Sequence, residues 1–103
     1  MEEWRHSYDV KWEVSNLGNV RNKKSGLVLR PYWRKYLTVG GQKNRTPVHR
    51  LVAFAFLGDP PQGMPDPTID HIDFNTANNA AVNLKWLSRS DNSRKGNRWW
   101  KIS

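Results

Sequence analysis

Four polar residues in the second half of the chain have the types and spacing of a metal-assisted hydrolytic site: Asp70, His71, Asn83 and Asn92. Carboxylate and amide oxygens are hard ligands, which suit Mg²⁺ or Mn²⁺. A neutral imidazole beside them can accept a proton from an attacking water. We therefore predict that Asp70 and Asn92 hold one Mg²⁺ or Mn²⁺ ion and that His71 is the general base. Asn83 is assigned to the same catalytic centre, where it orients the loop or the His71 ring through hydrogen bonds.

Taken singly, these residues have simpler interpretations: a turn aspartate, a structural histidine and an exposed helical asparagine. The elements around them favour the site, because strand, loop, strand and helix would bring Asp70 and Asn92 together. Asn92 would lie one turn into the helix and point back toward the strand that carries Asp70. The predicted elements are a strand over 68–72, a turn-rich loop over 73–79, a strand over 84–87 and a helix opening at Ser88-x-x-Asp91.

This segment resembles the HNH endonucleases of the ββα-metal superfamily, and among them the phage- and intron-type homing endonucleases. The matching stretches are Asp70-His71-Ile72-Asp73, Asn78-Asn79, Asn83-Leu84-Lys85-Trp86 and Ser90-Asp91-Asn92. The resemblance implies hydrolysis of DNA phosphodiesters to 5′-phosphate and 3′-hydroxyl ends. Because the chain carries one such site, we expect each binding event to nick one strand. Phe74 stands where many members of the family have Gly, so we expect the loop to take its positive-φ residue at Asn75.

The first half of the chain predicts an antiparallel sheet followed by a helix. The stretch from Trp12 to Arg21 resembles the module that precedes the HNH domain in the same endonucleases. Thr46 as N-cap and Pro47 in the first turn predict the start of a helix that ends before Gly58. The expected strands cover 12–15, 20–21, 27–29 and 36–39.

We expect an α+β fold, with a small N-terminal antiparallel sheet and helix followed by a ββα-metal (HNH) unit. The predicted boundaries are a DNA-binding module over 1–57, a Pro/Gly-rich linker over 58–67 and the nuclease unit with a basic, aromatic tail over 68–103.

Composition points to a polyanion as partner. Lys and Arg number 17 against nine Asp and Glu, which gives a net charge of +8, and none of the 17 lies between Leu51 and Leu84. An acidic pocket between two basic flanks is the layout that a metal-dependent nuclease needs. DNA is the predicted partner, with no small-molecule cofactor, and a monomer and a homodimer both remain open.

The sequence argues against a membrane-spanning protein, a secreted protein and a zinc-binding protein. The longest apolar run, 51–57, is too short to cross a bilayer, and no signal-peptide pattern is present, so we expect a cytoplasmic protein, consistent with a phage- or mobile-element-encoded enzyme acting in its host. The absence of cysteine excludes thiolate zinc sites, and we expect no structural zinc. A site built from His6, His49 and His71 is possible on composition but poorly supported.

Basic residues on both sides of the site are predicted to contact DNA phosphates. They are Arg34, Lys35, Arg50, Arg89, Arg94, Lys95 and Arg98. Tyr32 and Tyr36 suit either the core or base stacking, and His49 is expected to pack at the surface. The pair Trp99-Trp100 could fold back on the core, clamp DNA or mediate self-association. A non-catalytic DNA-binding protein and an RNA-binding accessory protein are the alternative functions.

Overall fold

The first half of the protein folds as two small antiparallel sheets. The computed structural model describes the backbone of residues 1–102 and the side chains of residues 1–95. The first sheet has the order β1 (Trp4–His6), β2 (Trp12–Ser15), β3 (Val20–Asn22), and the second has the order β4 (Tyr32–Trp33), β5 (Leu37–Val39), β6 (Thr46–Pro47). The predicted antiparallel N-terminal region is confirmed, but it is divided between two sheets. The strand expected over 27–29 is reduced to an isolated bridge between Val28 and Arg21. Leu27 and Val28 are exposed, so a longer strand there would bury little apolar surface.

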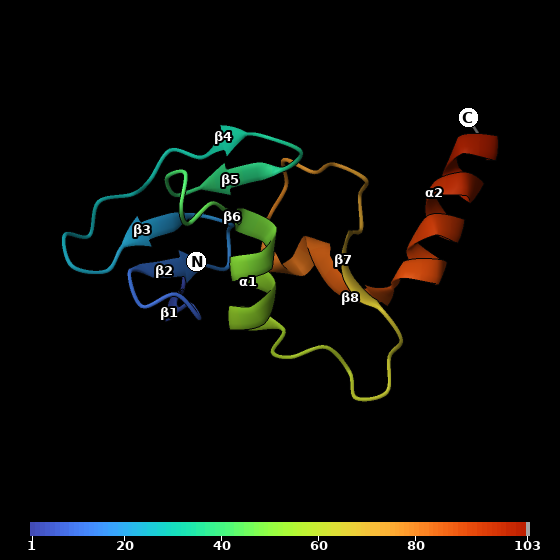
Figure 1. Ribbon diagram of the computed structural model, residues 1–103, viewed down its shortest axis with the longest axis horizontal. Helices are drawn as coiled ribbons and strands as arrows, with labels where there is room; N and C mark the ends of the chain where they lie inside the picture. Colours follow the sequence, from blue (N-terminus) through green and yellow to red (C-terminus); the bar gives the residue numbers. More distant parts are fainter. Residues whose placement is uncertain (103) are drawn as a thin grey trace.

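Helix α1 (Val48–Phe56) lies between these sheets and the C-terminal strands, as Figure 1 shows. Its buried residues, at positions 48, 51, 52 and 53, form one stripe that faces the core. The core joins both halves of the chain and contains Trp12, Val14, Val20, Val39, Val48, Leu51, Val52, Ala53 and Leu84.

The predicted start of this helix is one residue too early, because the N-cap is Pro47 and not Thr46. Thr46 and Pro47 pair with β5 as strand β6, and Pro47 is the residue that precedes the first helical turn. The Thr46 hydroxyl donates to the carbonyl of Asn44 instead of capping the helix. Pairing with a neighbouring strand therefore outweighs the local capping signal.

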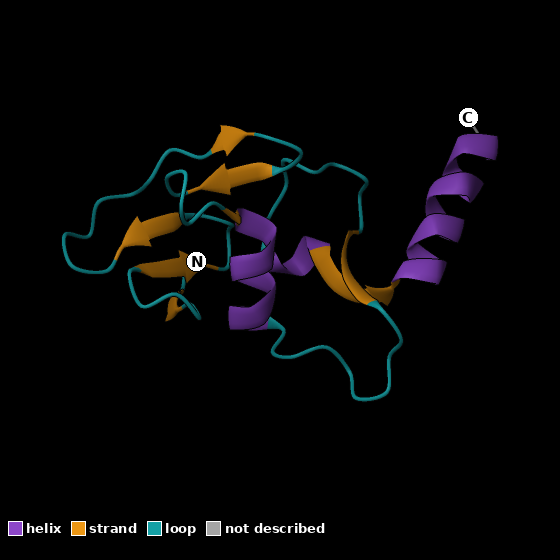
Figure 2. Ribbon diagram, in the orientation of Figure 1, coloured by secondary structure: helices purple, strands orange, loops and turns teal. Residues whose placement is uncertain are grey.

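The second half forms the predicted strand, strand and helix. Strands β7 (Pro67–His71) and β8 (Leu84–Ser88) pair antiparallel, the short 3-10 helix η1 (Ala81–Asn83) precedes β8, and α2 (Arg89–Ile102) follows it. The N–H of Asp91 donates to the Ser88 hydroxyl over 3.2 Å, as the capping signal predicted. In Figure 2, α2 leaves the β7–β8 pair and extends away from the rest of the molecule. Within the described part of the chain, no helix has both the length and the apolar character needed to cross a bilayer.

Candidate active site

His71 lies at the end of β7, and its ring is buried and fixed in orientation. Its Nε2 donates to the side-chain carbonyl of Asn79 over 2.8 Å. The rings of Tyr36 and His49 pack beside it, with centroids 6.4 and 5.1 Å away. Because Nε2 carries the proton in this hydrogen bond, Nδ1 of the neutral ring has the free lone pair. His71 therefore presents a base at Nδ1.

Asp70 and Asn92 share one hollow with His71, although 22 residues separate them in the sequence. Asp70 is buried on β7, and Asn92 lies in the first turns of α2. The amide nitrogen of Asn92 donates to the Thr68 hydroxyl over 2.9 Å, so the amide oxygen is the atom that can bind a cation. The hollow has a volume of about 160 Å³, and the structure brings the predicted base and both predicted ligands to it.

The donor set of this hollow fits a hard divalent ion. Asp70 Oδ2 already holds a cationic group, the ammonium of Lys95, over 2.6 Å. Among the described residues there is no cluster of three or more His, Cys, Asp or Glu side chains that could hold a metal. One carboxylate and one amide would leave most positions around Mg²⁺ or Mn²⁺ open for water and phosphate oxygens.

The Asn83 side chain is hydrogen-bonded to the loop between β7 and β8. Its amide donates to Asp73 Oδ1 over 2.8 Å and to the carbonyl of Asn78 over 2.9 Å, and its oxygen accepts the N–H of Asp73. The amide of Asn78, the N–H of Asn75 and the amide of Asn83 together lower the pKa of Asp73. Of the two roles considered for Asn83, these bonds favour orientation of the loop.

The positive-φ residue of this loop is Phe74, with φ of 66°, and the expectation of Asn75 is wrong. The N–H of Phe74 donates to the carbonyl of His71 over 2.9 Å and closes a tight turn after β7. The Lys95 ammonium lies 4.3 Å from the centre of the Phe74 ring, a cation–π contact that fixes the ring over the site. These contacts hold a conformation that a non-glycine residue rarely adopts.

Sequence reasoning missed Asn79 as a site residue and misplaced His49. The Asn78-Asn79 pair stands in the recognised motif, which was the available signal for Asn79. His49 is mostly enclosed, and its Nδ1 is buried with no hydrogen-bond partner among the described residues. Burial, followed by the nearby charges of His71 and Arg50, lowers the pKa of His49 from 6.5 to about 4. His49 is therefore an uncharged neighbour of the base rather than a surface residue.

The N-terminal sheet supports the segment that holds His71. The N–H of Ala81 donates to the carbonyl of Asn16, in the turn between β2 and β3, over 2.8 Å. In the same turn, Gly18 touches Asn79 so closely that a Cβ on Gly18 would lie 2.8 Å from the Asn79 carbonyl carbon. The turn that follows β2 thus fixes the backbone beside the His71 partner.

The residues predicted to contact phosphates are distributed over both halves of the molecule. Arg34 and Lys35 are exposed in the turn between β4 and β5, Arg50 is exposed on α1, and Arg89 is exposed at the start of α2. Arg94 pairs with Asp91 on its own helix, and Lys95 points into the site. The side chains of Arg98, Trp99 and Trp100 lie outside the described residues. Tyr36 is half-buried against His49, whereas Tyr32 is exposed.

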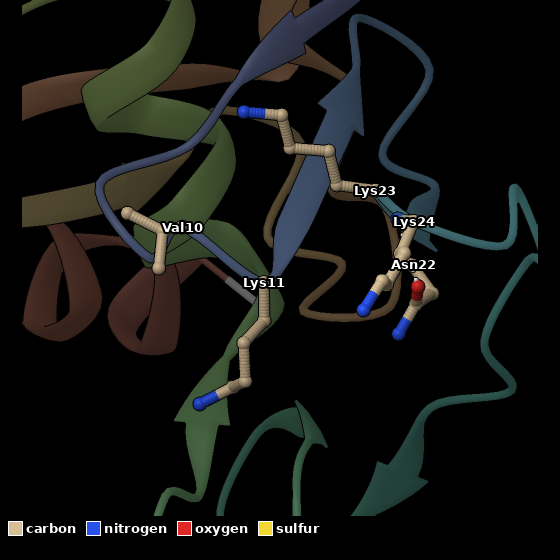
Figure 3. Close-up of a pocket in the computed structure, with 5 residues that line it drawn as sticks. All are labelled: Val10, Lys11, Asn22, Lys23 and Lys24. Atoms are coloured by element: carbon tan, nitrogen blue, oxygen red, sulfur yellow. Dashed lines mark hydrogen bonds between the residues drawn. The ribbon is translucent and has the colours of Figure 1, made fainter.

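A second hollow, of about 480 Å³, lies on the first sheet and is lined by Val10, Lys11, Asn22, Lys23 and Lys24. In Figure 3 the Lys11 and Lys23 side chains extend to opposite sides rather than toward one another. Its described lining has three ammonium groups and no carboxylate, so it cannot hold a cation as the Asp70 hollow can.

Comparison with known proteins agrees with this geometry. A sequence profile described as HNH endonuclease matches residues 46–94. DNA endonuclease I-HmuI of Bacillus phage SP01 is 36% identical over 98 residues, covering 87% of this chain and 55% of I-HmuI. Uncharacterized HNH endonuclease L245 of Acanthamoeba polyphaga mimivirus is 38% identical over 87 residues, covering 80% of this chain and 26% of L245.

A solved structure, described as DNA binding and cleavage by the HNH homing endonuclease I-HmuI, superimposes on this chain with a TM-score of 0.72. Its sequence identity is 32%, over 90% of this chain and 56% of that chain. The chain thus spans about half the length of I-HmuI.

Proposed function

Because residues 46–94 form an HNH endonuclease domain homologous to that of I-HmuI, we propose that this protein hydrolyses DNA phosphodiester bonds with one divalent metal ion. The observation that carries the proposal is the meeting of Asp70, His71 and Asn92 in one hollow. DNA is the proposed substrate because basic residues precede and follow the site residues along the chain and because the similar I-HmuI structure is described as one of DNA binding and cleavage.

His71 would act as the general base. Its Nδ1 lone pair can take a proton from water as the water attacks phosphorus, and the Asn79 carbonyl keeps Nε2–H engaged. As Nδ1 gains the proton, the imidazolium that forms retains its hydrogen bond to Asn79. Tyr36 and His49 pack beside the ring and restrict its rotation. The chain therefore supplies an oriented base whose geometry is fixed before substrate binds.

Asp70 and Asn92 would hold the metal ion through one carboxylate oxygen and one amide oxygen. When bound, Mg²⁺ or Mn²⁺ stabilises charge on the phosphate and on the leaving oxygen. The exposed Arg89, at the start of the same helix, lies where it can contact a neighbouring phosphate. One such site per chain attacks one strand, so the proposed product is a nick.

The test is the conversion of supercoiled plasmid to open circle by wild-type protein with Mg²⁺ or Mn²⁺, compared with EDTA. His71→Ala should lower the nicking rate by about 100-fold or more, the usual effect of losing a general base. DNA affinity in a gel-shift assay should change little, because the variant removes no phosphate contact. His6→Ala is the matched control, since His6 is exposed on β1 and does not line the hollow. Equal rates for wild type and His71→Ala, or undiminished cleavage in EDTA, would refute the proposal.

A further inference from the structure

The ammonium of Lys95 lies in an oxygen-lined position beside the predicted metal ligand. Its Nζ is 2.6 Å from Asp70 Oδ2, 3.2 Å from the carbonyl of His71 and 3.4 Å from the carbonyl of Ile72. The Phe74 ring closes another side, 4.3 Å from Nζ. Three oxygens and an aromatic face form the kind of environment that selects a cation. Lys95 therefore occupies a cation position rather than extending freely into solvent.

A divalent ion that binds Asp70 must compete with this ammonium. Among the described residues that line the hollow, Asp70 supplies the one carboxylate, and it is itself buried. An added cation beside Lys95 would bring like charges within a few ångströms in a partly enclosed site, where repulsion is poorly screened. The neutral amide of Asn92 cannot compensate for that repulsion. The site therefore reaches its highest affinity for the divalent ion only when Lys95 leaves Asp70.

We propose that Lys95 gates the metal site: its ammonium holds Asp70 in the DNA-free protein and moves to a DNA phosphate when the divalent ion enters. This inference rests on the proposed function. Lys95 follows Asn92 by three positions on α2, which places both side chains on one face of the helix. A phosphate oriented toward Asn92 would thus be close to the Lys95 ammonium.

The gate makes metal and DNA binding mutually strengthening. DNA draws Lys95 from Asp70 and so raises the affinity for the metal, and by linkage the metal raises the affinity for DNA by the same factor. The free protein should hold the metal weakly. In this arrangement Lys95 is a positioning residue that confines an assembled metal site to the DNA complex.

The first test measures Mn²⁺ binding to the free protein by the electron paramagnetic resonance signal of unbound Mn²⁺. Lys95→Met keeps the length of the side chain and removes the charge, and it should lower the Mn²⁺ dissociation constant by about tenfold or more. Lys95→Gln is a second uncharged variant and should agree. Lys43→Met is the matched control, because it removes the same charge from an exposed loop, and it should change the constant by less than about twofold. Equal Mn²⁺ affinity in wild type, Lys95→Met and Lys95→Gln would overturn the gate.

The second test adds a short DNA duplex to proteins that carry His71→Ala, so that the DNA stays uncut. DNA should strengthen Mn²⁺ binding by about tenfold when Lys95 is present, and by much less in the His71→Ala/Lys95→Met double variant. An equal gain in both proteins would refute the switch. Wild-type nicking, measured in parallel, separates the two proposals. If wild type nicks DNA but Lys95 has no effect on Mn²⁺ affinity, only the gate fails. If wild type does not nick DNA with any metal, the proposed function fails.

Discussion

Gly18→Ala tests whether the N-terminal sheet positions His71, the proposed general base. Gly18 has φ of +93° in the turn between β2 and β3, and a Cβ there would lie 2.8 Å from the carbonyl carbon of Asn79 and 2.9 Å from its oxygen. Both contacts are to backbone, so the segment that begins at Asn79 must shift. That shift would loosen the 2.8 Å hydrogen bond between Asn79 and His71 Nε2.

The expected losses of stability and activity distinguish backbone strain at the glycine from displacement of Asn79. Alanine in the left-handed region costs about 1–2 kcal/mol of folding free energy. Gly26→Ala is the matched control, because Gly26 also has a positive φ, +77°, but a Cβ added there would have no atom within 4 Å. Gly26→Ala should therefore show the strain alone. Gly18→Ala should show a larger loss of stability and, in addition, a loss of activity of about 10–100-fold, the usual cost of disturbing a residue that orients a site group.

The assay is urea unfolding followed by circular dichroism, together with plasmid nicking at a temperature where both variants remain folded. Nicking rates are compared after correction for the folded fraction. If folded Gly18→Ala nicks at the rate of Gly26→Ala, the contact with Asn79 has no role in catalysis, and the reasoning is refuted.

Two further predictions concern stability. The pKa of His49 is about 4 in the folded protein and 6.5 in the unfolded chain, so the unfolded chain binds the proton first as pH falls. Stability should fall by up to about 1.4 kcal/mol per pH unit between 6.5 and 4, by at most about 3 kcal/mol in all. His49→Phe should lose this component in unfolding titrations, and an identical pH dependence in both proteins would contradict it. Leu51→Ala removes a fully buried core side chain, and urea unfolding should show a loss of about 2–5 kcal/mol. A loss below about 1 kcal/mol would show that Leu51 is not central to the core.

Local sequence signals predicted the elements that depend on neighbouring residues. The Ser88 cap and the two strands before it are encoded within a few positions, and the structure places them as expected. The predicted start of α1 was wrong for a non-local reason, because Thr46 and Pro47 pair with β5 instead of entering the helix. The prediction that Asn75 has the positive φ of the loop was wrong for a similar reason, since Phe74 has it. Its left-handed conformation is held by a contact with Lys95, 21 positions away in the sequence.

The sequence by itself predicted the chemistry of the candidate site, because Asp70, His71 and Asn92 offer two oxygen ligands and a base at a recognisable spacing. The tertiary structure alone decided what surrounds them. Asn79 fixes the free lone pair at Nδ1 of His71, and Lys95 places a cation on Asp70. The physical reason is that residue types and short spacings fix which reactions are possible. Proton position, burial and charge pairing depend on distances of about 3 Å between atoms that only the packed fold brings together.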